Sequence, residues 1–314
     1  MASQPVDGQS CSSVEQGILI VGLACLDIVN VASRFPEEDQ DMRVDSQRWC
    51  RGGNAGNSSV ILAQLGVSVE YFGTLARVPV TDIVTQDLAR YGVLHNKCVY
   101  HTNCFTPTSI VIVNEASGSR TILHGNRSLP ELTSEDFDKL DLSCYKWIHF
   151  EGRNITEVIK MVEKIRTYNK SCRRDEVITV SVEVEKPRNE YQKLFALGDV
   201  VFVSKDYARY HGYKTAVEAL HGFSGLIKER AQLICAWGEE GAWGMDEDHH
   251  IHHSSAFPPD KLLETLAAGD TFNAAVIFCL WKGKSLQDTL SFSCRLAGFK
   301  CGIQGLDISG FKTS

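Results

Sequence analysis

The sequence predicts an α/β fold in which a doubly wound, mostly parallel sheet carries a small β-sheet lid. Three observations lead to this prediction: short apolar runs recur along the chain, helical patterns separate several of them, and two segments are strand-like without helices. Alternating strands and helices imply parallel strands covered by helices on both faces. The 314 residues, 43% of them hydrophobic, are enough for one large domain of this kind.

The strands of the main sheet are expected where apolar runs are bounded by glycine or polar residues. These runs cover residues 17–23, 69–72, 146–150, 177–184, 200–203 and 232–237. After the third run, Ile155, Val158, Ile159, Val162 and Ile165 form the apolar stripe of a helix. Ligands of such sheets bind outside the carboxyl ends of the strands, so residues that follow each run are candidate site residues.

The lid is expected from two segments that fit the strand–helix alternation poorly. Residues 28–50 follow the first strand without a helical pattern, and residues 98–124 are rich in strand-forming residues. Within the second segment, residues 108–113 and 119–123 are strand-like runs joined by a turn-rich loop, which indicates a pair of strands. Residues 17–314 are therefore expected to form one domain, with its lid drawn from about 28–50 and 98–124.

Composition argues against several classes of function. The net charge is −7 and no run of five basic residues exists, so we expect no nucleic-acid partner. No apolar run approaches the roughly 20 residues of a membrane span, so we expect no membrane partner. Residues 1–16 are polar and predict a disordered tail or an expression remnant. The eleven scattered cysteines are expected to be reduced thiols, which favours a cytoplasmic protein.

The first candidate site is a turn of small residues, TLAAGDTFN at 265–273, that opens a helix. The buried face of this helix is marked by Phe272, Ala275, Val276, Cys279 and Leu280. The first N–H groups of a helix lack intrahelical acceptors, and the helix dipole makes that end positive. The turn is therefore expected to bind an anion, phosphate above all.

Asp270 stands at the mouth of this predicted anion site. A carboxylate there can take a proton from a hydroxyl that attacks a phosphate. A second interpretation is that Asp270 only caps the helix, since Gly-Asp before a helix is common. The residues around it leave both interpretations open.

The second candidate site combines Asp27 with the motif RGGNAGN at 51–57. Asp27 follows the first strand, where a carboxylate can accept hydrogen bonds from two neighbouring hydroxyls. Gly53 allows a ligand to approach the backbone closely, and Asn54 and Asn57 lie three residues apart on one helix face. Amide groups both donate and accept hydrogen bonds, which suits a hydroxyl-rich ligand. A turn aspartate and a Gly-Asn loop that caps a helix remain alternatives.

These two motifs resemble the two signatures of the ribokinase-like (PfkB) carbohydrate kinases. The string AAGDTFNAA is similar to the Gly-Ala-Gly-Asp signature, and RGGNAGN is similar to the Gly-Gly signature with spaced asparagines. Longer strings, among them WIHFEGRN at 147–154 and SVEVEKPR at 181–188, resemble the ketohexose-phosphorylating members from about residue 18 to 307. Residues 114–130 are closer to the A-type than to the C-type splice form of those enzymes.

The resemblance implies a ribokinase-like three-layer fold and an ATP-dependent kinase that phosphorylates the C1 hydroxyl of fructose. It implies Asp270 as catalytic base, with Ala267, Ala268 and Gly269 forming the anion hole. The implied sugar ligands are Asp27, Gly53, Asn54, Asn57, Asp270 and, in the partner subunit's site, Asp39. The implied ATP-binding residues are Arg120, Gly238, Glu239, Glu240, Gly241, Ala267, Ala268, Gly269, Phe257, Pro258, Phe272 and Cys301. For Arg120, the residues alone leave an ordinary exposed hairpin arginine as the alternative.

The same resemblance implies Mg²⁺ bound mainly to ATP oxygens. A homodimer formed through the lids is expected because an uncovered lid would expose strand edges. Glu151 and Glu183, each at a strand end, are candidates to contact the magnesium through water. Relatives place a monovalent cation, often K⁺, near the position of Glu264, where most of them have aspartate.

Two departures from the family pattern leave alternatives open. Ala267 replaces the first glycine of the signature, and a Cβ there is strained if φ is positive. Glu264 is longer than the usual aspartate, which puts the monovalent cation site in doubt. The alternatives are therefore another ribokinase-like sugar specificity, or a weakened protein that binds sugar and nucleotide as a sensor.

Overall fold

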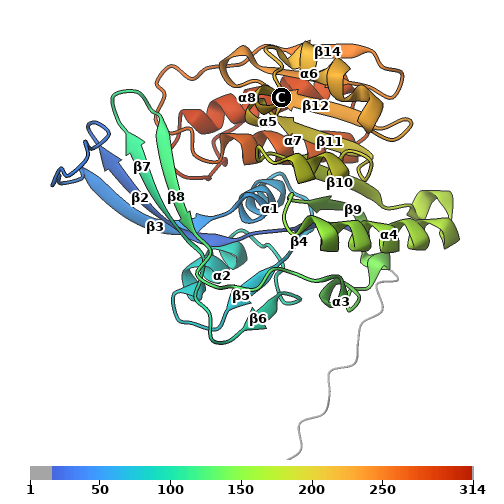
Figure 1. The fold of residues 1–314 in the computed structure, drawn as a ribbon, viewed down its shortest axis with the longest axis horizontal. Helices are drawn as coiled ribbons and strands as arrows, with labels where there is room; N and C mark the ends of the chain where they lie inside the picture. Colours follow the sequence, from blue (N-terminus) through green and yellow to red (C-terminus); the bar gives the residue numbers. More distant parts are fainter. Residues whose placement is uncertain (1–15, 313–314) are drawn as a thin grey trace, which may run out of the picture.

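The computed structural model describes residues 16–312 of the chain (Figure 1). The tail predicted over residues 1–16 therefore lies outside the described residues, except for Gln16. The side-chain amide of Gln16 donates a hydrogen bond to the Ser143 carbonyl oxygen (2.8 Å). No helix in the described part of the chain is long and apolar enough to cross a membrane.

The main sheet has eight strands in the order β14-β13-β12-β11-β10-β9-β1-β4. All five pairings from β4 to β12 are parallel, and β13 and β14 add an antiparallel edge. The strands are β1 (Gly17–Val21), β4 (Val69–Phe72), β9 (Tyr145–Phe150), β10 (Thr179–Val184), β11 (Val200–Ser204), β12 (Gln232–Ala236), β13 (Ala242–Met245) and β14 (Ile251–Ser254). Each of the six predicted apolar runs contributes one strand, and the predicted mostly parallel sheet is confirmed.

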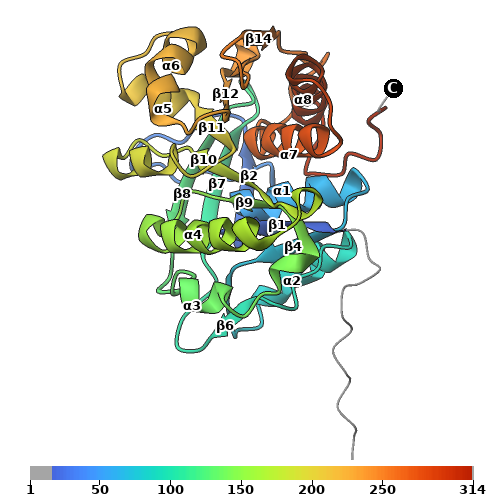
Figure 2. The same cartoon turned by 90° about the vertical axis from the view of Figure 1, so that its right-hand side faces the viewer.

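Helices cover both faces of this sheet and make the fold three-layered (Figure 2). One face packs against α1 (Asn54–Gln64), α2 (Thr81–Arg90), α7 (Ala268–Trp281) and α8 (Leu286–Cys301). The other face packs against α3 (Ser134–Phe137), α4 (Ile155–Ser171), α5 (Lys205–Tyr210) and α6 (Ala216–Phe223). Short 3-10 turns are η1 (Leu142–Cys144), η2 (Arg174–Glu176), η3 (Asn189–Leu194), η4 (Ser224–Leu226) and η5 (Gly238–Glu240).

A second sheet of four strands, the small sheet, stands beside the main body (Figure 1). Its order is β3-β2-β7-β8, built from β2 (Cys25–Ala32), β3 (Ser46–Gly52), β7 (Thr108–Asn114) and β8 (Arg120–Gly125). The small sheet thus begins at Cys25 and takes strands from both segments expected to supply the lid. Residues 99–101, also assigned to the lid, instead form β6 (Val99–His101), which pairs with β5 (Thr74–Ala76) in a separate two-stranded sheet.

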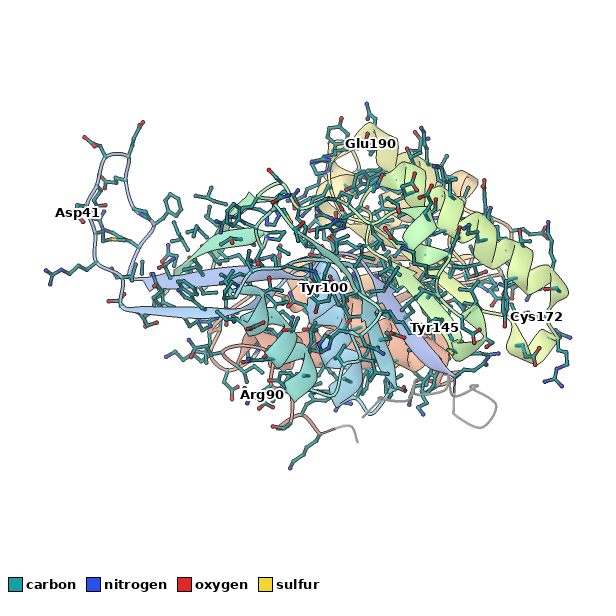
Figure 3. All side chains as sticks on the ribbon, turned by 90° about the horizontal axis from the view of Figure 1, so that it is seen from below. Asp41, Arg90, Tyr100, Tyr145, Cys172 and Glu190 are labelled. Carbon is teal, nitrogen blue, oxygen red and sulfur yellow. The ribbon has the colours of Figure 1, made fainter. Side chains whose placement is uncertain are left out.

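The topology brings the candidate site residues to one edge of the main sheet. Because β1, β9, β10, β11 and β12 are parallel, their carboxyl ends meet at that edge. The chain leaves β1 at this edge and enters β2, so the small sheet starts where the site is expected. The connection between β2 and β3, around Asp41, projects away from the body (Figure 3).

Candidate active site

Asp270 lies in the first turn of α7 but does not cap it. The N-cap is Ala267, which adopts a left-handed conformation with φ 61° and makes no side-chain capping bond. Asp270 is the third residue of the helix, and its side chain is 8% exposed. The alternative in which Asp270 is only a helix cap is therefore wrong, because the turn places its carboxylate toward α1.

The Asp270 carboxylate is held by a chain of side-chain hydrogen bonds from the second motif. Asn57 Nδ2 donates to Asp270 Oδ2 (2.6 Å), and Arg51 Nη1 donates to Asn57 Oδ1 (2.5 Å). Arg51 Nε in turn donates to Asp87 Oδ2 on α2 (2.8 Å). The Arg51 bond fixes the amide orientation of Asn57, because a guanidinium only donates. Asn57 therefore presents its donor side to Asp270.

Burial raises the pKa of Asp270 to about 7, with the charge of Glu185 adding to the increase. The hydrogen bond from Asn57 and the charges of Arg120 and Lys186 act in the opposite direction. A carboxyl group that titrates near neutral pH is suited to accept a proton and release it again.

Two further carboxylates, at the end of β10, lie close to this group. Asn54 Nδ2 donates to Glu185 Oε2 (2.9 Å) and to Glu183 Oε2 (3.3 Å). Asn273 Nδ2 donates to Glu183 Oε1 (3.0 Å). Burial, followed by the charges of Glu185 and Asp270, raises the pKa of Glu183 well above its usual value. The site therefore concentrates negative charge that a bound cation would relieve.

The turn before Asp270 offers free backbone donors beside open space. Among the described residues, the N–H groups of Gly269 and Asp270 have no hydrogen-bond acceptor, whereas the Ala268 N–H donates to the Thr265 carbonyl (3.3 Å). A Cβ added to Gly269 would meet nothing within 4 Å. Of the predicted donors, those of Ala267, Gly269 and Asp270 are thus free within the described chain, and the Ala268 N–H is the exception. The sequence predicted the whole run from Ala267, but the left-handed turn at Ala267 directs the Ala268 N–H back toward Thr265.

Asp27 belongs to β2 of the small sheet and not to the end of the first strand. It is 5% exposed, and burial raises its pKa. Cys25 Sγ donates to Asp27 Oδ1 (3.3 Å), and Ser109 on β7 lies directly across the strand pair. The backbone approaches closely here, because a Cβ on Gly52 would lie 2.1 Å from Asp27 Oδ2.

Gly53 is required at its position by two separate constraints. Its φ is +89°, in the region that favours glycine, and it precedes α1 as the N-cap. A Cβ there would also come within 2.4 Å of the Leu23 carbonyl oxygen. The Gly-Gly pair thus lets three chain segments meet: the end of β1, the small sheet and the start of α1.

The residues predicted to bind ATP come from several separate chain segments. Arg120, at the start of β8, donates from Nη1 to Thr265 Oγ1 (3.2 Å). Gly241 (φ +100°), which follows η5, packs closely on Ser254. A Cβ on Gly241 would lie 2.0 Å from the Ser254 carbonyl oxygen. The backbone at Phe257 lies directly against Gly298 of α8. The Cys301 carbonyl accepts a hydrogen bond from the N–H of Leu263 (2.9 Å).

The remaining predicted site residues differ from one another in exposure. Phe272 is 4% exposed and packs in the core with α1 and α8, whereas Phe257 and Pro258 are exposed. The side chains of Glu239 and Glu240 are exposed, and Glu239 Oε1 accepts a bond from Lys205 (2.9 Å). Asp39 is exposed in the β2–β3 connection, with φ 62°, and none of the other predicted ligands is its hydrogen-bond partner.

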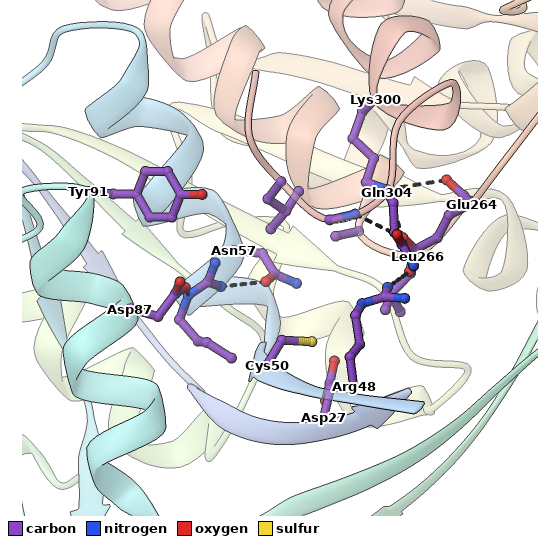
Figure 4. A pocket seen from close by; sticks show the side chains of 14 residues that line it. Asp27, Arg48, Cys50, Asn57, Asp87, Tyr91, Glu264, Leu266, Lys300 and Gln304 are labelled. Carbon is purple, nitrogen blue, oxygen red and sulfur yellow. Dashed lines mark hydrogen bonds and ion pairs between the residues drawn. The ribbon is translucent and has the colours of Figure 1, made fainter. Parts of the chain in front are cut away.

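A cavity of about 260 Å³ lies behind the anion turn (Figure 4). Glu264, which lines it, is 3% exposed. The Arg48 guanidinium pairs with Glu264 Oε1, the Gly305 N–H donates to Oε2 (3.0 Å), and Lys300 Nζ lies 3.8 Å from Oε2. The cavity is lined by Asp27, Arg48, Cys50, Arg51, Asn57, Asp87, Tyr91, Glu264, Leu266, Ala267, Lys300, Gln304, Gly305 and Leu306.

Sequence reasoning missed several of these residues. Arg51 stood inside the quoted motif without a role, and Glu185 follows a predicted strand at the ligand-binding edge. Position alone could have marked both of them. The sequence around Arg48 and Lys300 does not indicate that either residue belongs to the site. Both contact Glu264, which is distant from them in sequence.

Comparison with known proteins agrees with the family resemblance of the two motifs and extends it over most of the chain. The family model described as pfkB family carbohydrate kinase matches residues 15–312. Ketohexokinase of Mus musculus is 48% identical over 293 residues, which cover 93% of this chain and 98% of the mouse protein. Ribokinase of Arabidopsis thaliana is 21% identical and covers 92% of this chain and 76% of its own length.

Solved structures share the fold at lower identity. Ribokinase from Giardia lamblia superposes with a TM-score of 0.80 at 14% identity, covering 93% of this chain and 95% of that one. The Arabidopsis thaliana ribokinase complexed with ribose and ATP superposes with a TM-score of 0.76 at 19% identity, covering 93% and 94%. The predicted ribokinase-like architecture is therefore confirmed.

Proposed function

Because the chain belongs to the pfkB family of carbohydrate kinases, we propose that it transfers the γ-phosphoryl group of ATP to the C1 hydroxyl of fructose. The products are fructose 1-phosphate and ADP. The similarity to mouse ketohexokinase supports the sugar. The observation that supports the chemistry most directly is a buried Asp270, oriented by Asn57, beside the unpaired N–H groups of a helix start.

The proposed reaction is an in-line displacement. The C1 hydroxyl oxygen forms a bond to the γ-phosphorus while the bond from that phosphorus to the β-phosphate bridging oxygen breaks, and ADP leaves. Asp270 accepts the hydroxyl proton. The N–H groups of Gly269 and Asp270 stabilise the charge on the transferred group, and Arg120 adds a fixed positive charge. Asp27, Asn54 and Asn57 hold the remaining sugar hydroxyls.

Magnesium fits the concentrated negative charge of this site. Among the described residues no group of three or more His, Cys, Asp or Glu side chains is placed to hold a metal ion alone. We propose that Mg²⁺ arrives on the ATP oxygens, with Glu151 or Glu183 contacting it through water. Bound there, the ion would neutralise phosphate charge and oppose the repulsion that raises the pKa of Glu183.

A panel of sugars with coupled detection of ADP tests the proposed function. We expect ATP-dependent turnover on fructose and much weaker turnover on ribose. Activity on ribose without activity on fructose would overturn the assignment of substrate and favour the other ribokinase-like specificity. Fructose 1-phosphate is distinguished from fructose 6-phosphate by NMR of the product.

The same panel, repeated with K⁺ replaced by Na⁺, tests the monovalent cation. The Glu264 carboxylate already has Arg48, Lys300 and the Gly305 N–H as partners, so its charge is neutralised by the protein. We therefore expect the rate to be unchanged by this replacement. Strong activation by K⁺ would show that the ion binds despite these partners.

A protein with weakened catalysis that binds sugar and nucleotide as a sensor remains a second candidate, because Ala267 is held at φ 61°. A left-handed alanine costs about 1–2 kcal/mol, which Ala267→Gly would relieve. For an active kinase we expect Ala267→Gly to raise the melting temperature and change kcat only modestly. The matched Ala268→Gly, inside the helix, should lower the melting temperature. A native protein that binds both ligands but gains large turnover only as Ala267→Gly would favour the sensor.

We further propose a homodimer through the small sheets. Each small sheet carries an apolar row on the face opposite Asp27. Neighbouring residues on its four strands form this row: Trp49, Ile28, Ile110 and Leu123. Trp49 is 52% and Leu123 61% exposed in the single chain. Such a continuous apolar row on an exposed sheet favours burial by a second copy. Asp39 would then reach the sugar bound by the partner subunit.

Light scattering at micromolar concentration tests this dimer. We expect the native protein to be dimeric and Leu123→Glu to be monomeric. Tyr210→Glu is the matched control, because Tyr210 is 50% exposed on α5, outside the small sheet. A monomeric native protein would contradict the proposal.

We also propose that the protein works in the cytoplasm. The ten described cysteines are all free thiols, which suits a reducing compartment. Imaging of a tagged chain in cells tests this, and a secreted chain would contradict it.

A further inference from the structure

The segment that leads into α7, residues 262–267, is attached to the small sheet by polar contacts. The Arg48 guanidinium on β3 forms an ion pair with Glu264. The next residue, Thr265, donates from Oγ1 to the Gly118 carbonyl at the β7–β8 turn (3.2 Å) and accepts a bond from Arg120 of β8. Strands β3 and β8 are the two edges of the small sheet, so its opposite edges hold adjacent residues of one segment.

Apolar contacts bind the same segment to the small sheet. Leu266 packs against the buried cluster of Val29, Val111 and Val113, which forms the core of that sheet. Leu262 lies so close to the β7–β8 turn that a Cβ on Gly118 would be 2.7 Å from its Cδ2. Ala267, the last residue of this segment and the N-cap of α7, follows directly after Leu266.

The segment is also fastened to the main body. The Glu264 carbonyl accepts a bond from Lys300 Nζ on α8 (3.2 Å), and its carboxylate accepts the Gly305 N–H. Residues 262–267 therefore bridge the small sheet and the helix that carries Asp270. A shift of the small sheet cannot leave this segment in place, because Leu266 would lose its apolar partners and Glu264 would lose a buried charge partner.

We propose that Arg48 and Leu266 are positioning residues that couple sugar binding at the small sheet to nucleotide binding at the anion turn. The inference rests on the proposed function, in which Asp27 of the small sheet contacts the sugar and the α7 turn contacts the γ-phosphate. Sugar bound to Asp27 sets the position of the small sheet, and residues 262–267 transmit that position to the N–H groups of Gly269 and Asp270. By linkage, nucleotide binding tightens sugar binding by the same factor.

Calorimetric titration measures this coupling without turnover. A nonhydrolysable ATP analogue with Mg²⁺ is titrated into the protein with and without saturating fructose. We expect fructose to tighten the binding of the analogue by about 5–150-fold in the native protein. In Arg48→Met and Leu266→Ala we expect this factor to fall close to one, while the protein still binds each ligand alone.

Matched variants separate positioning from folding. Leu266→Met keeps the apolar contact and should keep the coupling. Arg230→Met removes an exposed ion pair with Glu247 outside the site and should also keep it. In steady-state assays at saturating fructose, Arg48→Met should raise the KM for ATP, because fructose no longer tightens nucleotide binding, and should also lower kcat, because the anion turn is misplaced in the ternary complex.

The outcomes distinguish this inference from the proposed function. Native coupling that persists in both Arg48→Met and Leu266→Ala would overturn the inference, as would a native protein that binds both ligands without coupling and still phosphorylates fructose. A native protein that binds neither fructose nor the analogue would overturn the proposed function and, with it, the coupling.

Discussion

Asp270→Asn is expected to lower kcat by about 10²–10⁴-fold while fructose and ATP analogues still bind, because the amide cannot accept the hydroxyl proton. The substitution preserves shape, and the new side-chain oxygen can still accept the hydrogen bond from Asn57 Nδ2. Turnover is measured by coupled ADP detection, and binding by calorimetry. Asn57→Asp is a poor control because it places a second carboxylate beside Asp270. Ser58→Ala in the same helix is better, since the Ser58 hydroxyl donates to the Asp270 carbonyl (3.3 Å) and not to its carboxylate.

The pH dependence gives an independent measure of the same residue. Burial raises the pKa of Asp270 to about 7, so protonation of this carboxylate competes with its role as base when the pH falls below that value. The base must be deprotonated to act, so kcat/KM should fall as the pH drops below about 7. In the residual activity of Asp270→Asn this acidic limb should be absent. If the decrease of kcat/KM at acidic pH persists in Asp270→Asn, or if the variant turns over at the native rate, Asp270 is not the base.

Gly52→Ala is expected to raise the KM for fructose by roughly 10–100-fold, with little change in the KM for ATP. The added Cβ would lie 2.1 Å from Asp27 Oδ2 and 2.2 Å from its Cγ, so the carboxylate must leave its position. Losing hydrogen bonds to a charged group costs about 1.5–3 kcal/mol, which corresponds to this range of affinity. Initial rates at varied fructose and saturating ATP measure the effect.

The matched control for this substitution is Gly125→Ala. Gly125 ends β8 of the same small sheet, and a Cβ there would find its nearest neighbour, the Thr108 carbonyl oxygen, at an ordinary 3.8 Å. We expect this variant to keep the native KM for fructose. Native affinity in Gly52→Ala, with a thermal melt that shows it folded, would exclude Asp27 from sugar binding.

Much of the fold could be predicted from local sequence pattern. Each apolar run bounded by glycine or polar residues became a strand of the main sheet, because a strand buried on both faces needs continuous apolar side chains. The helix after the anion turn begins within a few residues of the expected position, since the small residues and the apolar stripe are both local signals. The strained Ala267 was also foreseeable, because a glycine position was recognised by resemblance and the observed φ is positive.

The exact placement of the site could not be predicted in this way. Asp27 was expected at the end of the first strand but lies inside β2, because nothing in the short loop after Val21 shows that a new strand starts at Cys25. Residues 99–101 look like lid strand by composition but pair with β5, and pairing partners are not encoded in a single run. The Ala268 N–H was expected to be free, and only the turn geometry directs it to Thr265.

Residue types and their spacing within short stretches are enough to predict the α/β class, the family and the two motifs with their carboxylate and amides. Three features become visible only in the folded chain: Asn57 holds Asp270 across 213 residues of chain, Glu183 and Glu185 lie close to Asp270, and Arg48 on the small sheet pairs with Glu264. Burial, charge repulsion and ion pairing depend on distances between atoms, and distant segments acquire those distances only when the sheets and helices pack.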